Sequence, residues 1–193
     1  MKKKISFKEF NPFPGLRPFA PDDSDLFFGR EVESEEVIGK LLKNRYVAVL
    51  GASGNGKSSL INCGVLPKIR NLKTGESSLM KIISFRPGNN PTGNLELALS
   101  ESISNTVHDK SDGNKILPDI HHNSDDLASV FGDNMIKTDD KVLLVIDQFE
   151  DLFRYGSTAK TGLSQTPSAK FVDFIVNTIN RPVLNVYIIV SSV

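Results

Sequence analysis

The stretch at residues 46–60, YVAVLGASGNGKSSL, constrains the fold of this chain more than any other part of the sequence. An apolar run meets a glycine-rich bend, and a helical pattern follows directly. Gly51, Gly56, Lys57 and Ser58 satisfy the spacing G-x-x-x-x-G-K-[ST]. A chance match in a chain of 193 residues is rare, because glycine occupies only about 7% of positions in proteins. The stretch therefore predicts a strand, a phosphate-binding loop and a helix.

The chemistry of phosphate binding explains this spacing. Glycines let successive backbone N–H groups point inward and form an anion-binding nest, and the helix N-terminus adds partial positive charge. Lys57 would then reach the β- and γ-phosphates of a nucleoside triphosphate, and the Ser58 hydroxyl would reach Mg²⁺. The same Walker A loop and the helical turn after it offer further candidate contacts: Ser53, Gly54, Asn55 and Ser59.

A second motif, LLVIDQFED, offers the carboxylate that a bound Mg²⁺ needs. Its apolar residues lead to Asp147 at the end of a predicted strand, the position of a Walker B carboxylate. A general base must also orient water, and Gln148 cannot usefully accept a proton. Glu150 is our candidate base, with Asp151 as the neighbouring alternative. Glu150 could instead compensate the partial positive charge of a helix N-terminus.

The rest of the chain predicts an α/β domain with three layers and a mainly parallel central sheet, as in a P-loop NTPase. Apolar runs with little alternation belong to a sheet covered on both faces. Such runs occur at residues 46–50, 80–85, 141–147 and 184–190. Helices are expected between them, at 31–43, from about 57 to 66 with Pro67 as the stop, and from Pro91, Ser124 and Pro167. We expect residues 1–12 to be a tail, 13–193 to be the core, and 108–123 to be a surface loop.

Three sets of residues outside these motifs are further candidates. The entry segment, residues 13–30, is rich in Pro, Gly and Phe, so its phenylalanines, including Phe27 and Phe28, should pack against the core. Arg86 could face the phosphates or could shape the turn that Pro87 and Gly88 predict. Ser191, at the end of the last strand, could contact the γ-phosphate.

Composition excludes several classes of protein. The chain has 23 basic and 23 acidic residues, which gives no strong signal for nucleic acid or an acidic membrane. It has one cysteine, which fits a reducing compartment, and no run near the roughly 20 apolar residues of a membrane span. His108, His121 and His122 lack the spacing of a metal site. We therefore expect a cytoplasmic protein without a membrane anchor.

Several of these stretches resemble the novel STAND NTPases, a branch of the signal-transduction ATPases with numerous domains. NPFPGLRPFAPDDSDLFFGRE is similar to the entry segment of that family, and GASGNGKSSLINCGVLPKI to its phosphate loop and first helix. FRPGNNP resembles its turn after the second strand, and LLVIDQFEDLF its metal-binding strand. Asp151 departs from the family, which usually has a second Glu there, and this shorter carboxylate weakens the case for position 151 as the base. The likeness covers nearly the whole chain.

The resemblance implies a nucleotide-controlled switch that binds ATP, or another nucleoside triphosphate, with Mg²⁺ and couples a sensor to an effector domain. It also implies a bacterial protein with a role in defence or regulated death, and allows an oligomer in the active state. Gly29 and Arg30 would lie near the adenine. The family continues beyond its last strand into a lid subdomain, so we expect a chain truncated before the lid. Slow hydrolysis is our leading hypothesis, and a non-hydrolysing nucleotide-binding scaffold is the alternative.

Overall fold

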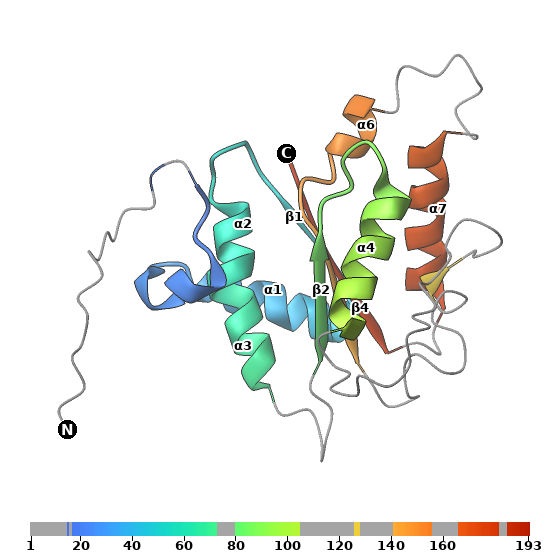
Figure 1. The fold of residues 1–193 in the computed structure, drawn as a ribbon. Helices are drawn as coiled ribbons and strands as arrows, with labels where there is room; N and C mark the ends of the chain where they lie inside the picture. Colours follow the sequence, from blue (N-terminus) through green and yellow to red (C-terminus); the bar gives the residue numbers. More distant parts are fainter. Residues whose placement is uncertain are drawn as a thin grey trace, which may run out of the picture.

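The computed structural model describes residues 15, 17–72, 80–104, 126–127, 141–155, 166–181 and 185–193. Within them a sheet has four strands: β1 (Tyr46–Leu50), β2 (Lys81–Phe85), β3 (Val142–Ile146) and β4 (Val186–Ser192). All pairings are parallel, in the order β1-β4-β3-β2 (Figure 1). The predicted α/β architecture with a parallel sheet is confirmed. Strand β4 separates the strand that leads to the phosphate loop from the strand that leads to Asp147.

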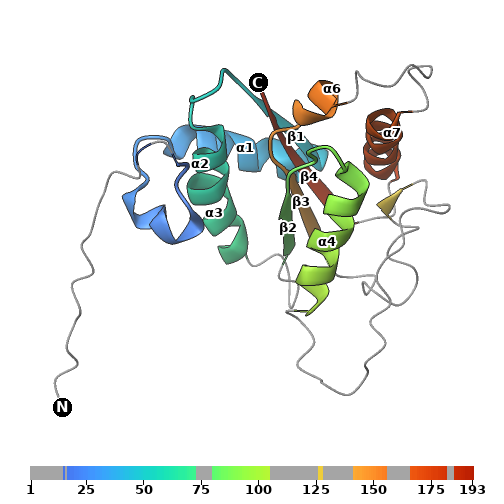
Figure 2. The ribbon, with the colours of Figure 1, turned by 45° about the horizontal axis from the view of Figure 1, so that its top comes forward.

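Helices cover both faces of this sheet. The helical elements are η1 (Pro21–Leu26), α1 (Glu31–Asn44), α2 (Lys57–Ser59), η2 (Leu60–Val65), α3 (Leu66–Asn71), α4 (Pro91–Ser104), α6 (Asp151–Tyr155) and α7 (Pro167–Asn180). Figure 2 shows α1 and the continuous segment α2–η2–α3 on one side of the strands, with α4 and α7 on the other. This is the three-layer arrangement that uniformly apolar strands predict.

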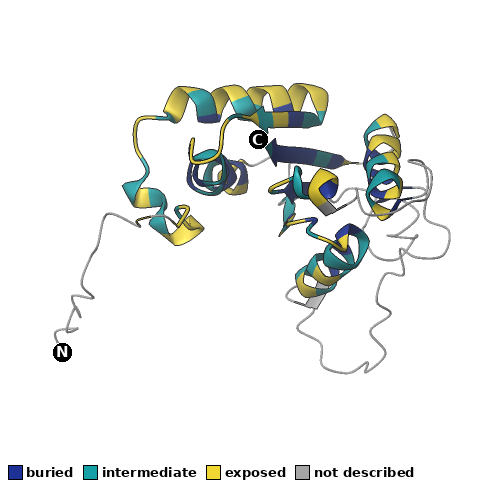
Figure 3. Ribbon diagram, turned by 90° about the horizontal axis from the view of Figure 1, so that it is seen from above, coloured by how far each residue is buried: buried dark blue, intermediate teal, exposed yellow. Residues whose placement is uncertain are grey.

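Strand β3 shows how the two cores are built. All five of its residues are buried, and they alternate between the faces of the sheet. Leu143 and Val145 pack with α1, η2 and α3 in one cluster, whereas Val142, Leu144 and Ile146 pack with α4 and α7 in the other. Figure 3 shows the strands largely buried between helices whose outer faces are exposed. Two apolar layers therefore fix the plane of the sheet, and with it the edge where its strands end.

The helix after the phosphate loop does not stop at Pro67, contrary to our expectation. Residues 60–65 form a π-helical turn, and α3 then begins one residue before the proline. Proline is tolerated in the first turn of a helix, where its missing N–H costs no hydrogen bond. The wider turn ahead of it thus lets the helical path continue to Asn71.

Helix α7 begins as the sequence predicts. Thr166 is its N-cap, and its hydroxyl accepts a hydrogen bond from the Ala169 N–H at 3.2 Å. Of the helix expected from Ser124, only residues 126–127 are described, and Leu127 is fully buried there. The loop expected at 108–123 lies outside the described residues. Among the helices that the structure describes, none combines the length and apolar character needed to cross a bilayer.

Candidate functional site

The phosphate loop connects β1 to α2 and bends at two glycines. Gly54 has a φ of 83° and Gly56 a φ of 73°, a region that side chains with a Cβ rarely adopt. The Gly51 N–H donates to the Ser192 carbonyl of β4 at 3.2 Å, so the loop is fastened to the neighbouring strand where it starts. Local backbone conformation therefore explains the motif glycine at position 56, and Gly54 makes a second such bend at a position that the motif leaves open.

Lys57 holds the loop from within. Its Nζ donates to the carbonyl of Gly51 at 2.6 Å and to that of Ala52 at 3.0 Å. The ammonium group therefore lies against the first residues of the loop and lines the cavity that the loop borders. A bound phosphate would offer it stronger, charged acceptors than these carbonyls.

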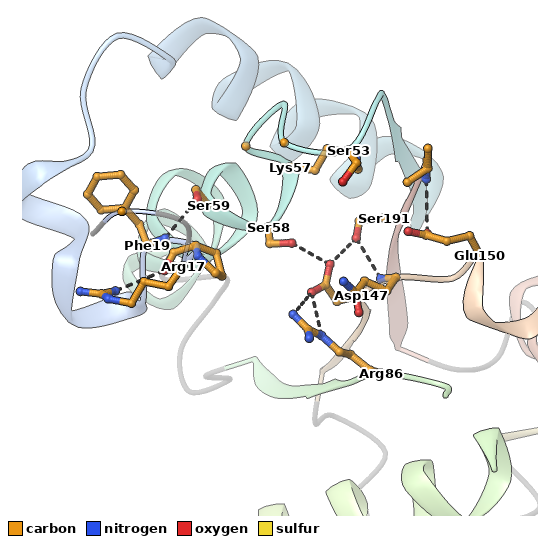
Figure 4. Close-up of a pocket in the computed structure, with 16 residues that line it drawn as sticks. Arg17, Phe19, Ser53, Lys57, Ser58, Ser59, Arg86, Asp147, Glu150 and Ser191 are labelled. Carbon is orange, nitrogen blue, oxygen red and sulfur yellow. Dashed lines mark hydrogen bonds and ion pairs between the residues drawn. The ribbon is translucent and has the colours of Figure 1, made fainter. Parts of the chain in front are cut away.

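Four polar side chains meet at the edge of the sheet, and we call them the strand-end cluster: Ser58, Arg86, Asp147 and Ser191. Oδ1 of Asp147 accepts hydrogen bonds from the hydroxyls of Ser58 at 2.9 Å and Ser191 at 2.5 Å. Its Oδ2 accepts from Nε and Nη2 of Arg86, at 3.2 and 3.1 Å (Figure 4). One carboxylate therefore joins three other side chains.

The sheet topology explains why these residues meet. Arg86 directly follows β2, Asp147 directly follows β3, and Ser191 is the second-last residue of β4. Ser58 belongs to the helix that follows β1 and the loop. The carboxyl ends of parallel strands lie at one edge of a sheet, which is where ligands bind in α/β proteins. Ser58 and Asp147 are in contact although 89 residues separate them.

The two candidate bases differ in position. Glu150 lines the cavity beside the strand-end cluster, and its Oε2 accepts a hydrogen bond from the Val193 N–H at 3.3 Å. Asp151 instead begins helix α6 and is not among the residues that line the cavity. Geometry therefore favours Glu150 over Asp151 as the carboxylate that could act on a ligand.

Gln148, to which sequence reasoning gave no role, also lines the cavity. Its φ is 57°, in the left-handed region that residues other than glycine rarely adopt. Its N–H lies 3.4 Å from the Ser191 hydroxyl, which ties the turn after Asp147 to β4. Strained backbone of this kind concentrates at functional sites. Sequence reasoning missed Gln148 because no sequence pattern indicates a positive φ at a glutamine.

A cavity of about 670 Å³ connects the phosphate loop with the strand-end cluster. This volume lies within the range of roughly 300–1,000 Å³ that small-molecule sites have. The loop contributes Ser53, Gly54, Gly56 and Lys57, and Ser58 and Ser59 follow them in the lining. The entry segment contributes Arg17, Pro18 and Phe19, which sequence reasoning did not single out.

Side chains of α2 and η2 hold the entry segment in this place. The Phe19 N–H donates to the Ser59 hydroxyl at 3.1 Å, and the Cys63 thiol donates to the Ala20 carbonyl at 3.0 Å. Asn62 Nδ2 approaches the Phe19 carbonyl at 3.4 Å. Burial raises the pKa of the Cys63 thiol, which keeps it protonated and able to donate. The hydroxyl of Ser59 thus binds the entry segment.

Arg17 is oriented by an aspartate of η1. Its Nη1 lies 2.7 Å from Oδ2 of Asp23, and that carboxylate oxygen also accepts from the Ala20 N–H at 2.8 Å. The Arg17 guanidinium, with the Ala20 N–H, holds the pKa of the Asp23 carboxyl below its usual value. The entry segment therefore carries its own charge pair into the region of the cavity.

Gly29 and Arg30 lie differently from each other. Arg30 Nη1 donates to the Asn55 carbonyl of the phosphate loop at 3.0 Å. Gly29 is exposed, and its N–H donates to Oε1 of Glu31. Neither residue, nor Gly51 or Asn55, is among those that line the cavity. Arg30 therefore touches the loop from outside, and a contact of Gly29 or Arg30 with a nucleotide base stays a prediction.

The expectation that Phe27 and Phe28 both pack inward is wrong for Phe28. Phe27 packs edge-to-face on Phe19, with ring centroids 5.9 Å apart, and approaches Gly64 of η2. Phe28 is 76% exposed. Successive side chains in extended backbone point in opposite directions, so only one of the pair can face the core.

The residues of the site fit a divalent cation together with phosphate. Ser58 and Asp147 offer a hydroxyl and a carboxylate that already touch, and hard oxygen ligands suit Mg²⁺. Mg²⁺ usually takes one or two carboxylates and completes its shell with substrate phosphates and water. Lys57 and the loop N–H groups lie on the side of the cavity where those phosphates would bind.

Comparison with known proteins agrees with this geometry. No curated protein and no solved structure matches the chain. A family model described as Novel STAND NTPase 1 matches residues 12–192, which is nearly the whole sequence. Nucleotide binding on a P-loop fold, in a signalling protein of several domains, is the property that this family implies. The chain therefore belongs to the novel STAND NTPase 1 family.

Proposed function

We propose that this domain binds a nucleoside triphosphate, with ATP as the leading candidate, together with Mg²⁺. It would hydrolyse the nucleotide slowly and thereby switch a sensor or effector domain of the same signalling protein. The observation that carries the proposal is the contact between Ser58 and Asp147, 2.9 Å apart, at the mouth of a glycine-bent loop. This contact joins the two motifs that a triphosphate and its cation require.

Each part of the site has a role in this proposal. The backbone N–H groups of the loop and the N-terminus of α2 would bind the phosphates, and Lys57 would leave the Gly51 and Ala52 carbonyls for the β- and γ-phosphates. Ser58 and Asp147 would hold Mg²⁺, which offsets the charge of the phosphates. Glu150 would orient the attacking water and accept its proton.

The alternative is a scaffold that binds nucleotide without hydrolysing it. One observation favours it: Oε2 of Glu150 already accepts a hydrogen bond from the Val193 N–H. In this contact one carboxylate oxygen already has a donor, and it is then less available to orient a water molecule. Measured turnover separates the two functions, since both require binding and only the first releases phosphate.

A thermal-unfolding experiment tests the binding step. At a hundredfold excess over its dissociation constant, Mg-ATP should stabilise the wild-type domain by roughly 2.7 kcal/mol, because it binds the folded loop and not the unfolded chain. Lys57→Ala should lose most of this gain. Lys68→Ala is the matched control, because Lys68 lies on α3, does not line the cavity and makes an exposed ion pair with Glu35. Equal stabilisation of wild type and Lys57→Ala would refute the proposal.

A further inference from the structure

Arg86 holds the carboxylate on which the proposed cation site depends. Two of its nitrogens lie 3.2 and 3.1 Å from Oδ2 of Asp147, whereas Ser58 and Ser191 donate to Oδ1 of the same group. Figure 4 shows the guanidinium approaching Asp147 from the side opposite the phosphate loop. Both oxygens of the carboxylate therefore have donors.

The backbone at Arg86 is held by hydrogen bonds, whereas its side chain lies more than half in solvent. Asn94 Nδ2, on α4, donates to the carbonyls of Arg86 at 3.2 Å and Pro87 at 2.9 Å. Gly88 turns the chain there with a φ of 54°. The Arg86 side chain itself is 54% exposed, and the Asp147 side chain only 20%. The turn therefore fixes the backbone position of Arg86, and an ion pair made by so exposed a side chain costs little to break.

A cation and the guanidinium would compete for Asp147. Both are positive, and like charges a few Å apart repel, the more so in a partly desolvated cavity. Mg²⁺ on Asp147 would therefore weaken the Arg86 ion pair. A terminal phosphate beside that cation would give the guanidinium a new partner, since its planar fork suits phosphate as well as carboxylate.

The two other cationic side chains that line the cavity do not have the position of Arg86. Within the described residues these are Arg17 and Lys57. Arg17 is paired with Asp23 of its own segment, and Lys57 belongs to the loop that would bind the β-phosphate as well as the γ-phosphate. Only Arg86, among these three side chains, is bonded to Asp147, the carboxylate that would bind the cation.

We propose that Arg86 is the residue that distinguishes triphosphate from diphosphate, by exchanging its ion pair with Asp147 for the terminal phosphate when Mg²⁺ binds. This inference rests on the proposed function and adds to it a specificity-determining residue. With a diphosphate the phosphate partner is absent, so Arg86 stays on Asp147 and opposes the cation. The exchange would turn the presence of one phosphate into a change of partner for the Arg86 side chain, at the turn between β2 and α4.

The test is to measure dissociation constants of Mg-ADP and of a non-hydrolysable Mg-ATP analogue by calorimetry, for wild type, Arg86→Ala and Arg86→Lys. Arg70→Ala, an exposed arginine on α3, is the matched control. Arg86→Ala should lower the preference for triphosphate over diphosphate by about tenfold or more, the loss expected for a charge-assisted hydrogen bond. Arg86→Lys, which keeps the charge without the fork, should lower it less.

A second readout separates exchange from a merely structural role. Removal of Arg86 should reduce the Mg²⁺ concentration needed for half-maximal ADP binding, because the cation no longer competes with the guanidinium. If Arg86→Ala leaves the preference for the ATP analogue over ADP unchanged, whether or not both affinities fall, the inference is overturned while the proposed function stands. Failure of the wild-type domain to bind either nucleotide would overturn the proposed function as well.

Discussion

The two sides of the cavity are built by different physical means. On one side, the strand-end cluster joins polar side chains from three strand ends and the helix after the loop, through hydrogen bonds to the Asp147 carboxylate. On the other side, the entry segment is held by main-chain hydrogen bonds to Ser59 and Cys63 and by the packing of Phe19 on Phe27. The first side carries the polar groups that would contact a ligand, whereas the second forms a wall of the cavity.

This difference predicts how each side responds to substitution. Polar side chains at the end of a rigid sheet can change without loss of the core that positions them, so their loss should affect binding and turnover more than stability. Packed residues of the entry segment hold one element against another, so their loss should lower stability first. The following predictions test that division, from the largest expected effect to the smallest.

The largest effects should come from the carboxylates at the strand ends. Glu150→Gln should keep Mg-ATP affinity and lower turnover by about 10²–10⁴, the contribution of a general base. Asp147→Asn should instead weaken Mg²⁺-dependent binding, because the amide offers the cation no negative charge. Phosphate release and nucleotide titration with varied Mg²⁺ would measure both. Identical behaviour of the two variants in both assays would show that these roles are wrongly assigned.

A packing substitution under the entry segment should give the next effect. A Cβ on Gly64 would meet the Ser34 hydroxyl of α1, as well as Phe27 at 3.3 Å. Gly64→Ala should therefore destabilise the domain by about 1–3 kcal/mol, as overpacking does. Gly39→Ala is the control, because Gly39 lies in α1 with open space around it and should gain about 0.5–1 kcal/mol. Denaturant unfolding measures the stability of both variants. If Gly64→Ala is as stable as wild type, η2 can move away from α1 and Phe27 without cost.

Two neighbouring phenylalanines sharpen the comparison within the entry segment itself. Phe27→Ala should cost about 1–2 kcal/mol, less than a fully buried phenylalanine, because its ring is only half-buried against Phe19. Phe28→Ala should change stability by less than about 0.5 kcal/mol, because that ring is exposed. Thermal or denaturant unfolding of the Phe27→Ala and Phe28→Ala variants would measure both changes in stability. A larger loss for Phe28→Ala would contradict the packing described here.

The smallest effect concerns the pH dependence of the Arg17–Asp23 pair. The pKa of Asp23 is lowered in the folded state, so its contribution is present above the ordinary aspartate value of about 3.9 and is lost as pH falls through the lowered value. Asp23→Asn should therefore melt below wild type near neutral pH, with a gap that closes at acidic pH. Arg17→Ala should show a similar trend. A gap that does not change with pH would assign the effect to packing instead of charge.

The sequence by itself determined the α/β class, the four strands within a few residues, the phosphate loop, and the two motifs that carry Ser58 and Asp147. Each of these depends on a short-range pattern. Apolar runs predict buried strands, glycine predicts a backbone bend, and a carboxylate after a buried strand must lie at the edge of a parallel sheet. The membership of the novel STAND NTPase 1 family was also visible from such motifs.

Only the tertiary structure decided the rest. That β4 lies between β1 and β3 brings Ser191 onto Asp147, and strand order is set by packing on both faces rather than by any local pattern. The sequence left Arg86 open between a turn and a phosphate contact, and its ion pair appears only once β2 and β3 are neighbours. Which of Phe27 and Phe28 packs against the rest of the domain depends on where the entry segment meets η2. Contacts of this kind join residues far apart in the sequence, so they exist only after the sheet and its helices have assembled.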